Sequence, residues 1–396
     1  MRGLLITILI GLEVLLLLPV VVVFCEVMLA ITGTTNSSRR HGERRPLAVL
    51  IPAHNESSMI AATLRSILPQ LGDGDRLVVI ADNCTDDTAK IASWEGAEVI
   101  VRENLNQRGK SFAIDFGIRF LGLFAPDIVV IVDADCLVAP EAIDRLARAC
   151  QLCGRPVQGL YLIQARSDAG VKLRVAEFAW VIKNQVRPLG MRRLGLPCHL
   201  MGSGMAFPWQ CVRSANLATG HIVEDLQLGI DMARAGAAPL FCPDALITSE
   251  FPVSRDGVLV QRTRWEHGHL SVILSEGPRL LRDSMLQLDG GLLALMLDLC
   301  VPPLALLTLL VGATWVASWL LFVFTSLYAP FVLSSISAAL LFLAVICAWI
   351  KFGQHIISLG RLVFAVTYAF LKIPIYARFI FARQTAWIRS KRKGEE

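Results

Sequence analysis

The sequence predicts a Rossmann-like α/β domain flanked by membrane-spanning helices. Three observations support this fold class. Between Pro46 and Ala165, apolar strand patterns alternate with helical patterns, as they do in chains that build a parallel sheet. One long apolar run precedes this region, and a longer one follows it. Hydrophobic residues make up 54% of the 396 residues, which leaves room for one large soluble domain and several membrane helices.

The first apolar run extends from Leu4 to Leu29, and Glu13 and Glu26 are its only charged residues. It is longer than the roughly 20 residues that a helix needs to cross a bilayer. A cleaved signal peptide would have a shorter apolar region. We therefore expect an uncleaved membrane anchor over residues 1–31.

Basic residues indicate the orientation of this anchor. One arginine precedes it, whereas Arg39, Arg40, Arg44 and Arg45 follow it. The positive-inside rule then places the following domain in the cytoplasm and the N-terminus outside, and we expect a bacterial inner membrane. The net charge of +5 is concentrated beside the apolar segments. Anionic lipid headgroups explain that charge better than nucleic acid does.

The second apolar block, residues 291–350, is too long for one helix, and its prolines are natural breaks. The tail from Arg389 to Lys393 is basic, so it should return to the cytoplasm after an even number of crossings. The two expected crossings are Leu304–Ser326 and Phe331–Ile350. Leu292–Cys300 would lie shallow in the membrane or extend the first crossing.

Two further segments are expected at the membrane interface. One is residues 256–290, and the other lies in residues 351–396, ahead of the basic cytoplasmic tail. Leu362–Phe381 is apolar but carries two basic residues and a proline, which is typical of an amphipathic interfacial helix. If this segment crosses the membrane instead, Leu292–Leu310 must form a separate helix to keep the number of crossings even.

The ten cysteines are scattered through apolar stretches, as expected for reduced thiols in a cytoplasmic domain. Cys150 and Cys153 have the spacing of a metal or redox pair. No second pair with zinc spacing exists, and a closed zinc site needs four ligands, so core packing is the better interpretation.

The α/β domain is expected over residues 46–255. Its first strands are expected at Leu47–Ile51, Arg76–Ala81, Glu98–Val101 and Asp127–Val132. Helices are expected at Ser57–Leu68 and Lys110–Leu121, and the polar run after the second strand should open another. Ligands gather at the carboxyl ends of parallel strands, where Asp82, Asp133 and Asp135 are expected.

Several polar residues fit a binding site, and each also has a purely structural interpretation. Asp133 and Asp135 are hard oxygen ligands suited to a divalent cation, or they are solvated loop carboxylates. Gln261, Arg264 and Trp265 share one helical face, which also describes an interfacial arginine and tryptophan belt. The remaining candidates have local roles as alternatives, in helix starts, tight turns or solvated surfaces. They are Glu56, Asp82, Lys110, Gly202, Ser203 and Asp225.

Six motifs in this order resemble family 2 glycosyltransferases with the GT-A fold. The motifs are Ile51–Glu56, Ala81–Thr88, Arg108–Lys110, Asp133–Asp135, Val223–Asp225 and Gln261–Trp265. The chain is most similar to the membrane-embedded branch that contains cellulose, chitin and hyaluronan synthases and ceramide glucosyltransferase. The resemblance covers roughly Pro46 to His269.

The resemblance also implies roles for these residues. Asp225 would be the general base, in one displacement with inversion at the sugar. Arg264 would offset diphosphate charge, Trp265 would offer the acceptor a platform, and Gln261 belongs to the same motif. Donor contacts would come from Glu56, Asp82, Lys110 and Asp133. Asp135, with Asp133, would hold Mg²⁺ or Mn²⁺, and Gly202 and Ser203 would lie beneath the acceptor.

We therefore expect a hexosyltransferase that moves a sugar from a UDP-sugar to a lipid, a lipid-linked oligosaccharide or a growing polysaccharide, with a β-linked product. A processive synthase that exports its polymer is one alternative, although a few spans form a channel poorly without oligomerisation. A non-catalytic membrane subunit that senses nucleotides or lipids is another, since fold alone permits it. Retention of every expected catalytic residue type favours the enzyme. The sugar and the oligomeric state stay open.

The topology can be tested by labelling with a membrane-impermeant thiol reagent. In intact cells, Arg2→Cys should react, whereas Lys391→Cys should react only after the membrane is permeabilised. The unsubstituted chain controls for its ten native thiols. Labelling of Lys391→Cys from outside would mean an odd number of crossings after the anchor.

Overall fold

The protein was analysed as a computed structural model that describes residues 2–33, 43–220, 222–252 and 254–382. The chain divides into two compact units. Among the described residues, the sheet unit comprises residues 43–164 and 196–261, without 221 and 253, and the helical unit comprises residues 2–33, 165–195 and 262–382. The expected domain over residues 46–255 is therefore interrupted, because residues 165–195 group with the apolar helices. Arg39, Arg40 and the basic tail lie outside the described residues.

The sheet unit contains eight described strands in the order β3-β2-β1-β4-β7-β6-β8-β5. They are β1 (Leu47–Ala53), β2 (Arg76–Asp82), β3 (Glu98–Arg102), β4 (Ile128–Ile131), β5 (Leu137–Val138), β6 (Val157–Gln164), β7 (Met205–Pro208) and β8 (Leu240–Glu250). The first four are mutually parallel, and β7 joins β4 antiparallel. The predicted strands and their parallel pairing are confirmed. Most residues of β1, β2 and β4 are buried, which fits their nearly continuous apolar sequences.

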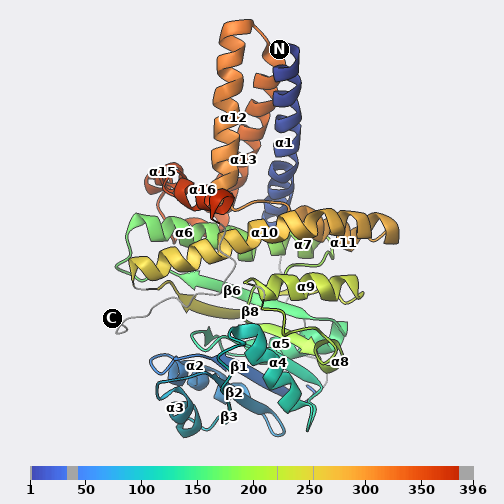
Figure 1. Ribbon diagram of the computed structural model, residues 1–396, viewed down its shortest axis with the longest axis vertical. Helices are drawn as coiled ribbons and strands as arrows, with labels where there is room; N and C mark the ends of the chain where they lie inside the picture. The colour runs from blue at the N-terminus through green and yellow to red at the C-terminus, as the bar shows by residue number, and fades with distance from the viewer. Residues whose placement is uncertain (1, 34–42, 221, 253, 383–396) are drawn as a thin grey trace. The chain divides into compact units, whose positions relative to one another are not determined.

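Seven helices of the sheet unit pack around this sheet or connect its strands (Figure 1). They are α2 (Ile60–Ile67), η1 (Leu68–Gln70), α3 (Thr88–Trp94), α4 (Lys110–Leu121), α5 (Ala142–Cys153), α8 (Trp209–Val212) and α9 (Glu224–Arg234). The predicted bounds of α4 are confirmed. The helix expected from Ser57 begins later, at Ile60, because the Glu56 carbonyl accepts from the amides of Met59 and Ile60 and closes a turn first.

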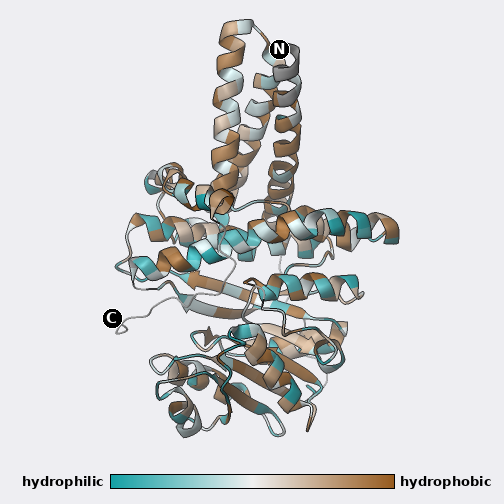
Figure 2. Cartoon of the chain, in the orientation of Figure 1, coloured by the Kyte–Doolittle hydropathy of each residue, from teal (hydrophilic) through white to brown (hydrophobic). Residues whose placement is uncertain are grey.

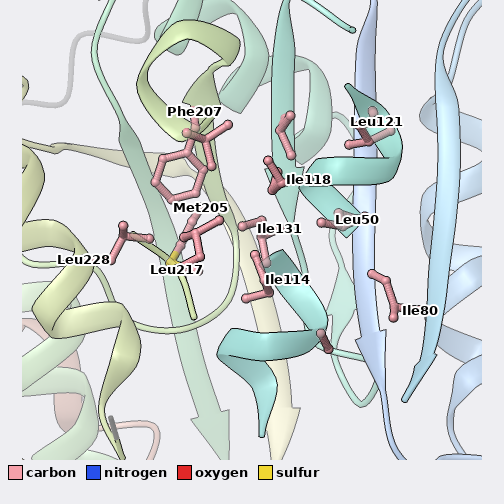
Figure 3. Packing of buried hydrophobic residues seen from close by; sticks show 14 of the residues in the cluster. Leu50, Ile80, Ile114, Ile118, Leu121, Ile131, Met205, Phe207, Leu217 and Leu228 are labelled. Atoms are coloured by element: carbon pink, nitrogen blue, oxygen red, sulfur yellow. The ribbon is translucent and has the colours of Figure 1, made fainter. Parts of the chain in front are cut away.

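The core beside α4 fixes the position of its first residue. Ile114, Ile118 and Leu121 on the buried face of α4 belong to one apolar cluster with Leu50 of β1 and Phe207 of β7 (Figure 3). Burying such a side chain contributes about 1.5–3 kcal/mol. Lys110, at the N-terminus of the same helix, is thereby held at the carboxyl end of the parallel strands.

The helical unit is built from long apolar helices and shorter mixed ones (Figures 1 and 2). They are α1 (Arg2–Thr32), α6 (Val171–Val181), the π-helical turn η2 (Ile182–Val186), α7 (Arg187–Arg193), α10 (Arg255–Gln287, which begins in the sheet unit), α11 (Gly290–Leu299), α12 (Leu304–Thr325), α13 (Tyr328–Ala348), the π-helical turn η3 (Trp349–Gly353), α14 (Leu359–Leu362), α15 (Phe364–Phe370) and α16 (Ile373–Phe381). Hydrophobic residues cover most of α1, α12 and α13 in Figure 2.

Four helical segments among the described residues are long and apolar enough to cross a membrane. They are Leu9–Thr32, Leu304–Thr325, Tyr328–Gly353 and Leu359–Phe381. The first three correspond to the expected anchor and the two expected crossings. The fourth was expected at the interface, and turns divide it into α14, α15 and α16. Leu292–Cys300 does not extend the first crossing, because α11 ends before Pro302 and Pro303. With ten residues, α11 is also too short to span about 30 Å of hydrocarbon.

A buried ionic group ties three helices of this unit together. Arg187 on α7 donates to Glu26 of α1 at 2.7 Å and forms a second ion pair with Asp298 of α11. Nearby, a Cβ atom on Gly190 would collide with the backbone of Glu26, so α1 and α7 approach closely only because glycine lies there. Glu26 and Arg187, the charged residues at the contact between α1 and α7, are therefore paired with each other rather than exposed to hydrocarbon.

Candidate active site

Three segments of the sheet unit meet at the carboxyl end of β4. Lys110 of α4 forms an ion pair with Asp133 and donates to the carbonyl of Gly202 at 2.6 Å. The amide of Asp133 in turn donates to the Ser203 hydroxyl at 3.1 Å. One lysine and one serine thus join the aspartate segment to the glycine turn that precedes β7.

The glycine turn has a conformation that the sequence can explain. Gly202 and Gly204 have φ angles of 95° and 68°, in the left-handed region that favours glycine. The buried Gln158 of β6 accepts from the Met201 amide and donates to the Ser203 carbonyl at 2.8 and 2.9 Å. The tight-turn interpretation of this motif is therefore confirmed, and the turn is held rigidly beside Lys110.

Asp225 lies against the same turn. It is in the first turn of α9, and a Cβ atom built on Gly202 would lie 3.3 Å from its Oδ2 and 3.8 Å from Lys110 Nζ. A side chain at residue 202 would therefore press on both charged groups. The structure thus brings together Lys110, Asp133, Gly202, Ser203 and Asp225, which are five of the residues singled out in the sequence.

The electrostatics of this cluster favour a bound cation. Burial raises the pKa of Asp133, and the charge of Lys110 opposes that shift. Burial alone would lower the pKa of Lys110, but the charges of Asp133, Glu224 and Asp225 outweigh it and raise that pKa. Asp135 also acts on Asp133, so one lysine faces four carboxylates. Their excess negative charge suits a divalent cation.

The donor atoms near Asp133 fit such a cation. Carboxylate oxygens of Asp133 and Asp135 and the Cys136 sulfur all lie within 4.8 Å of one another. Mg²⁺ and Mn²⁺ favour oxygen ligands. Burial raises the pKa of the Cys136 thiol far above its usual range, and that thiol already accepts from Ser203 at 3.3 Å. Asp133 and Asp135 are therefore the residues that fit the metal.

A pocket adjoins the cluster. It lies between α4 and α9, and Lys110, Glu224, Asp225 and Asp231 form its charged part. Ile114, Leu217 and Leu228 form its apolar part, together with further residues of α4, α9 and the preceding loop. A polar molecule in this pocket would lie within reach of the candidate base.

Asp82 does not start α3, which was the structural alternative for this residue. Instead Asp86 accepts from the Thr88 amide, while Asp82 accepts from Arg102 at 2.6 Å and from the Asn83 side chain at 2.9 Å. Burial raises the pKa of Asp82, and Arg102 opposes the shift.

Arg102 is a site residue that the sequence analysis missed. It is the last residue of β3, and the parallel register pairs it with Asp82, the last residue of β2. The sequence shows an aspartate and an arginine at the ends of two expected strands, which could have suggested an ion pair. Only the strand register shows that these two residues are neighbours. A further guanidinium nitrogen donates to the Gln107 carbonyl at 2.8 Å, which fixes the loop before Lys110.

At Glu56 the structure shows a helix-initiation role for the backbone. Its carbonyl accepts the bonds that close the turn before α2, and its amide donates to Thr88 at 2.8 Å. Two residues earlier, Nδ1 of His54 lies 2.6 Å from the carbonyl oxygen of Asp82, so this loop is attached to the end of β2. A donor contact of Glu56 stays a prediction.

Gln261, Arg264 and Trp265 all lie on α10, at the helical spacing expected of them. Gln261 is the last residue grouped with the sheet unit there, whereas Arg264 and Trp265 belong to the helical unit. Within the helical unit the Trp265 indole packs against Trp180 of α6. The rings of His267 and His269 contact the carbonyls of Ile375 and Leu299.

The chain belongs to the family 2 glycosyltransferases. The model of the family described as "Glycosyltransferase like family 2" matches residues 44–268, more than half of the chain. The match spans all six motifs found in the sequence. It does not extend over the apolar helices on either side of them. The protein is therefore a glycosyltransferase, and the enzyme class expected from the motifs is confirmed at this level.

Two curated relatives and one solved structure extend the comparison. The chain is 31% identical over 113 residues to an uncharacterized protein of Methanocaldococcus jannaschii, covering 28% of this chain and 45% of that one. It is 25% identical over 241 residues to a poly-beta-1,6-N-acetyl-D-glucosamine synthase of Staphylococcus aureus, covering 59% and 57%. The chain thus spans about half the length of these relatives.

The solved structure is a mannosyltransferase from Pyrobaculum calidifontis in complex with GDP-Man and Mn²⁺. The TM-score is 0.55 at 17% sequence identity, and the alignment covers 87% of this chain and 97% of the other. At this identity the likeness concerns the fold alone. It confirms the predicted GT-A architecture with helices that can span a membrane.

The buried pair of Asp82 and Arg102 generates a stability prediction. Arg102→Met would leave a buried carboxylate without its partner, which costs about 3–5 kcal/mol, so the melting temperature of the purified protein should fall clearly. The double variant Asp82→Leu with Arg102→Met should recover most of the loss, because the uncompensated charge is gone.

A neighbouring ion pair provides the control. Arg76 of β2 pairs with Glu98 of β3 in a more exposed position, so Arg76→Met should cost less than about 1 kcal/mol. Equal shifts for Arg76→Met and Arg102→Met would contradict the special role of the buried pair.

Proposed function

We propose that this glycosyltransferase is an inverting, metal-dependent enzyme that moves a hexose from a nucleotide-diphosphate sugar to an acceptor at a membrane. The observation that carries the proposal is the cluster of Lys110, Asp133, Asp135, Gly202 and Asp225. It combines two carboxylates that suit a cation, Asp133 and Asp135, with a lysine suited to phosphate and a separate carboxylate beside a pocket.

Each residue has a chemical role in this proposal. Mg²⁺ or Mn²⁺ held by Asp133 and Asp135 would supply positive charge to the leaving diphosphate. Lys110, at the N-terminus of α4, adds a positive charge on the donor side. Asp225 accepts the proton of the acceptor hydroxyl. The acceptor oxygen then bonds to the anomeric carbon as the bond from that carbon to the phosphate oxygen breaks on the opposite face.

The roles proposed for the α10 motif rest on the resemblance in sequence. Arg264 offsets the charge that develops on the diphosphate, and Trp265 gives the acceptor an aromatic platform. No enzyme nucleophile is needed, because one displacement inverts the anomeric centre. The product of an α-linked donor is then β-linked.

The donor is proposed to be a UDP-sugar. The motifs resemble enzymes in which an aspartate at the position of Asp82 holds the uracil ring. The Pyrobaculum enzyme is described with GDP-Man, so guanine nucleotides belong in the same test. Asp82 and Arg102 together offer a hydrogen-bond acceptor and a hydrogen-bond donor at the place where the nucleotide's ring is proposed to bind.

The acceptor is proposed to be a lipid, a lipid-linked oligosaccharide or a growing polysaccharide. The four membrane-capable segments support an acceptor that stays at a membrane. The likeness to the staphylococcal poly-beta-1,6-N-acetyl-D-glucosamine synthase supports the polysaccharide alternative, including a processive enzyme. We place the protein in a bacterial inner membrane, with the sheet unit in the cytoplasm and the N-terminus outside.

The experiment that tests the proposal measures nucleotide release by the purified full-length protein. A panel of UDP- and GDP-sugars is supplied with and without Mn²⁺ and with a bacterial lipid extract. One donor should be consumed in a metal-dependent way. Asp135→Asn should abolish this turnover and the metal dependence of UDP binding, because a ligand is lost. Metal-stimulated turnover in Asp135→Asn would show that this aspartate does not hold the metal.

The general base can be tested separately. Asp225→Asn is nearly isosteric and keeps a polar side chain in the first turn of α9, so a structural role predicts nearly normal turnover. A base predicts a fall in turnover of about 10²- to 10⁴-fold with donor affinity largely preserved. Donor binding and sugar transfer should be measured on the same preparation. Glu224→Gln, one residue earlier, is the matched variant, and it should keep most of the sugar transfer. Normal transfer by Asp225→Asn would show that Asp225 is not the general base, and Glu224 would then be the next candidate for that role.

A further inference from the structure

The indole rings of Trp180 and Trp265 form a pair within the helical unit. Their centroids are 4.8 Å apart, and their planes are inclined by 41°. Trp180 is on α6 and Trp265 on α10, so the pair joins two helices through residues that are 85 positions apart in sequence. Both side chains are only partly buried, which leaves part of this aromatic surface accessible.

The turn that follows α6 places the Lys183 side chain against the Trp180 ring. The π-helical turn η2 begins at Ile182, directly after α6, and it contains Lys183. The Lys183 ammonium lies 5.4 Å from the centroid of the Trp180 ring. A π-turn changes the direction in which successive side chains point, and such turns occur frequently at functional sites. The tryptophan pair therefore carries a positive charge at its Trp180 end.

The residues that follow Trp265 are fixed from another side. Glu266 forms an ion pair with Lys372, and the His267 ring contacts the Ile375 carbonyl at 2.9 Å. These contacts hold the backbone of α10 beside the start of α16. The Trp265 ring itself packs against the Trp180 ring, so Trp180 limits rotation of the indole.

We propose that Trp180 is a positioning residue for the acceptor, which acts by fixing the indole plane on which the acceptor lies. This inference rests on the proposed function, in which Trp265 contacts the acceptor. Stacking on an aromatic face requires a defined ring orientation, and a displacement of about 1 Å at a reacting centre can cost about 10²-fold in rate. The proposed contacts to the nucleotide lie in the sheet unit, and Arg264 is proposed to act on the diphosphate only as its charge develops, so loss of Trp180 should act mainly on the acceptor.

The test compares Trp180→Leu, which keeps apolar volume without a ring, with Trp180→Phe, which keeps an aromatic face. Trp319→Ala is the control, because Trp319 is 45% exposed on α12 and belongs to no proposed site. Full-length protein is assayed with the donor that the wild type uses. A bacterial total lipid extract is titrated as the acceptor probe, and donor hydrolysis is measured without extract. Near-ultraviolet circular dichroism reports the coupled indole pair without any turnover.

We expect the half-saturating amount of extract for Trp180→Leu to rise about tenfold, while its donor KM and its hydrolysis rate stay within about twofold. Trp180→Phe should recover most of the acceptor dependence. The circular dichroism signal of the pair should disappear in Trp180→Leu and persist in Trp319→Ala.

Two outcomes would overturn the inference. One is an unchanged requirement for extract in Trp180→Leu. The other is a parallel loss of donor affinity, acceptor affinity and thermal stability in both Trp180 variants, which indicates packing alone. A wild-type protein without turnover on any donor contradicts the proposed function instead, and the two failures are thereby distinguished.

Discussion

The ion pair between Lys110 and Asp133 is the interaction on which the candidate active site depends. Lys110 also donates to the Gly202 carbonyl, and Gly202 lies against Asp225. One ammonium group thus links the helix after β3, the aspartates after β4, the turn before β7 and the start of α9. Because the pair is partly buried, loss of either partner would leave an unbalanced charge beside the others. The glycine at residue 202 is required both for its backbone angle and for the space it leaves.

The helical unit shows a comparable use of charge. Arg187 forms ion pairs with both Glu26 and Asp298. Burial alone would lower the pKa of Arg187, but the two carboxylates outweigh burial and raise it. Charged groups within or beside apolar helices persist when they are paired, because an isolated charge there is expensive. This network holds the short helices α7 and α11 to the anchor α1. The segment that contains Trp180, Lys183 and Arg187 is thereby part of the helical unit, although it lies between two strands of the sheet in sequence.

Much of the fold was predictable from local patterns. Continuous apolar runs bounded by polar residues gave the positions of β1, β2 and β4, and hydropathy gave α1, α12 and α13. Residues that are close in sequence were also expected to lie near one another, and they do, as at Asp133 and Asp135 or along α10. The start of α2 was predicted a few residues too early, because the Glu56 carbonyl first closes a turn with Met59 and Ile60. The partner of Asp82 was not predicted, because the hydrogen bond from Arg102 to Asp82 joins two different strands.

The sequence by itself determined the family, through the order of its motifs, and the membrane-capable segments, through the length of its apolar runs. It also determined the chemical types of the candidate site residues. Only the tertiary structure decided which of those residues meet. Parallel register paired Asp82 with Arg102, chain reversal at Gly202 placed Lys110 beside Asp225, and the packing of α6 on α10 joined Trp180 to Trp265. Such contacts link residues tens of positions apart. They follow from how elements pack and pair in space, and no local sequence pattern records that arrangement.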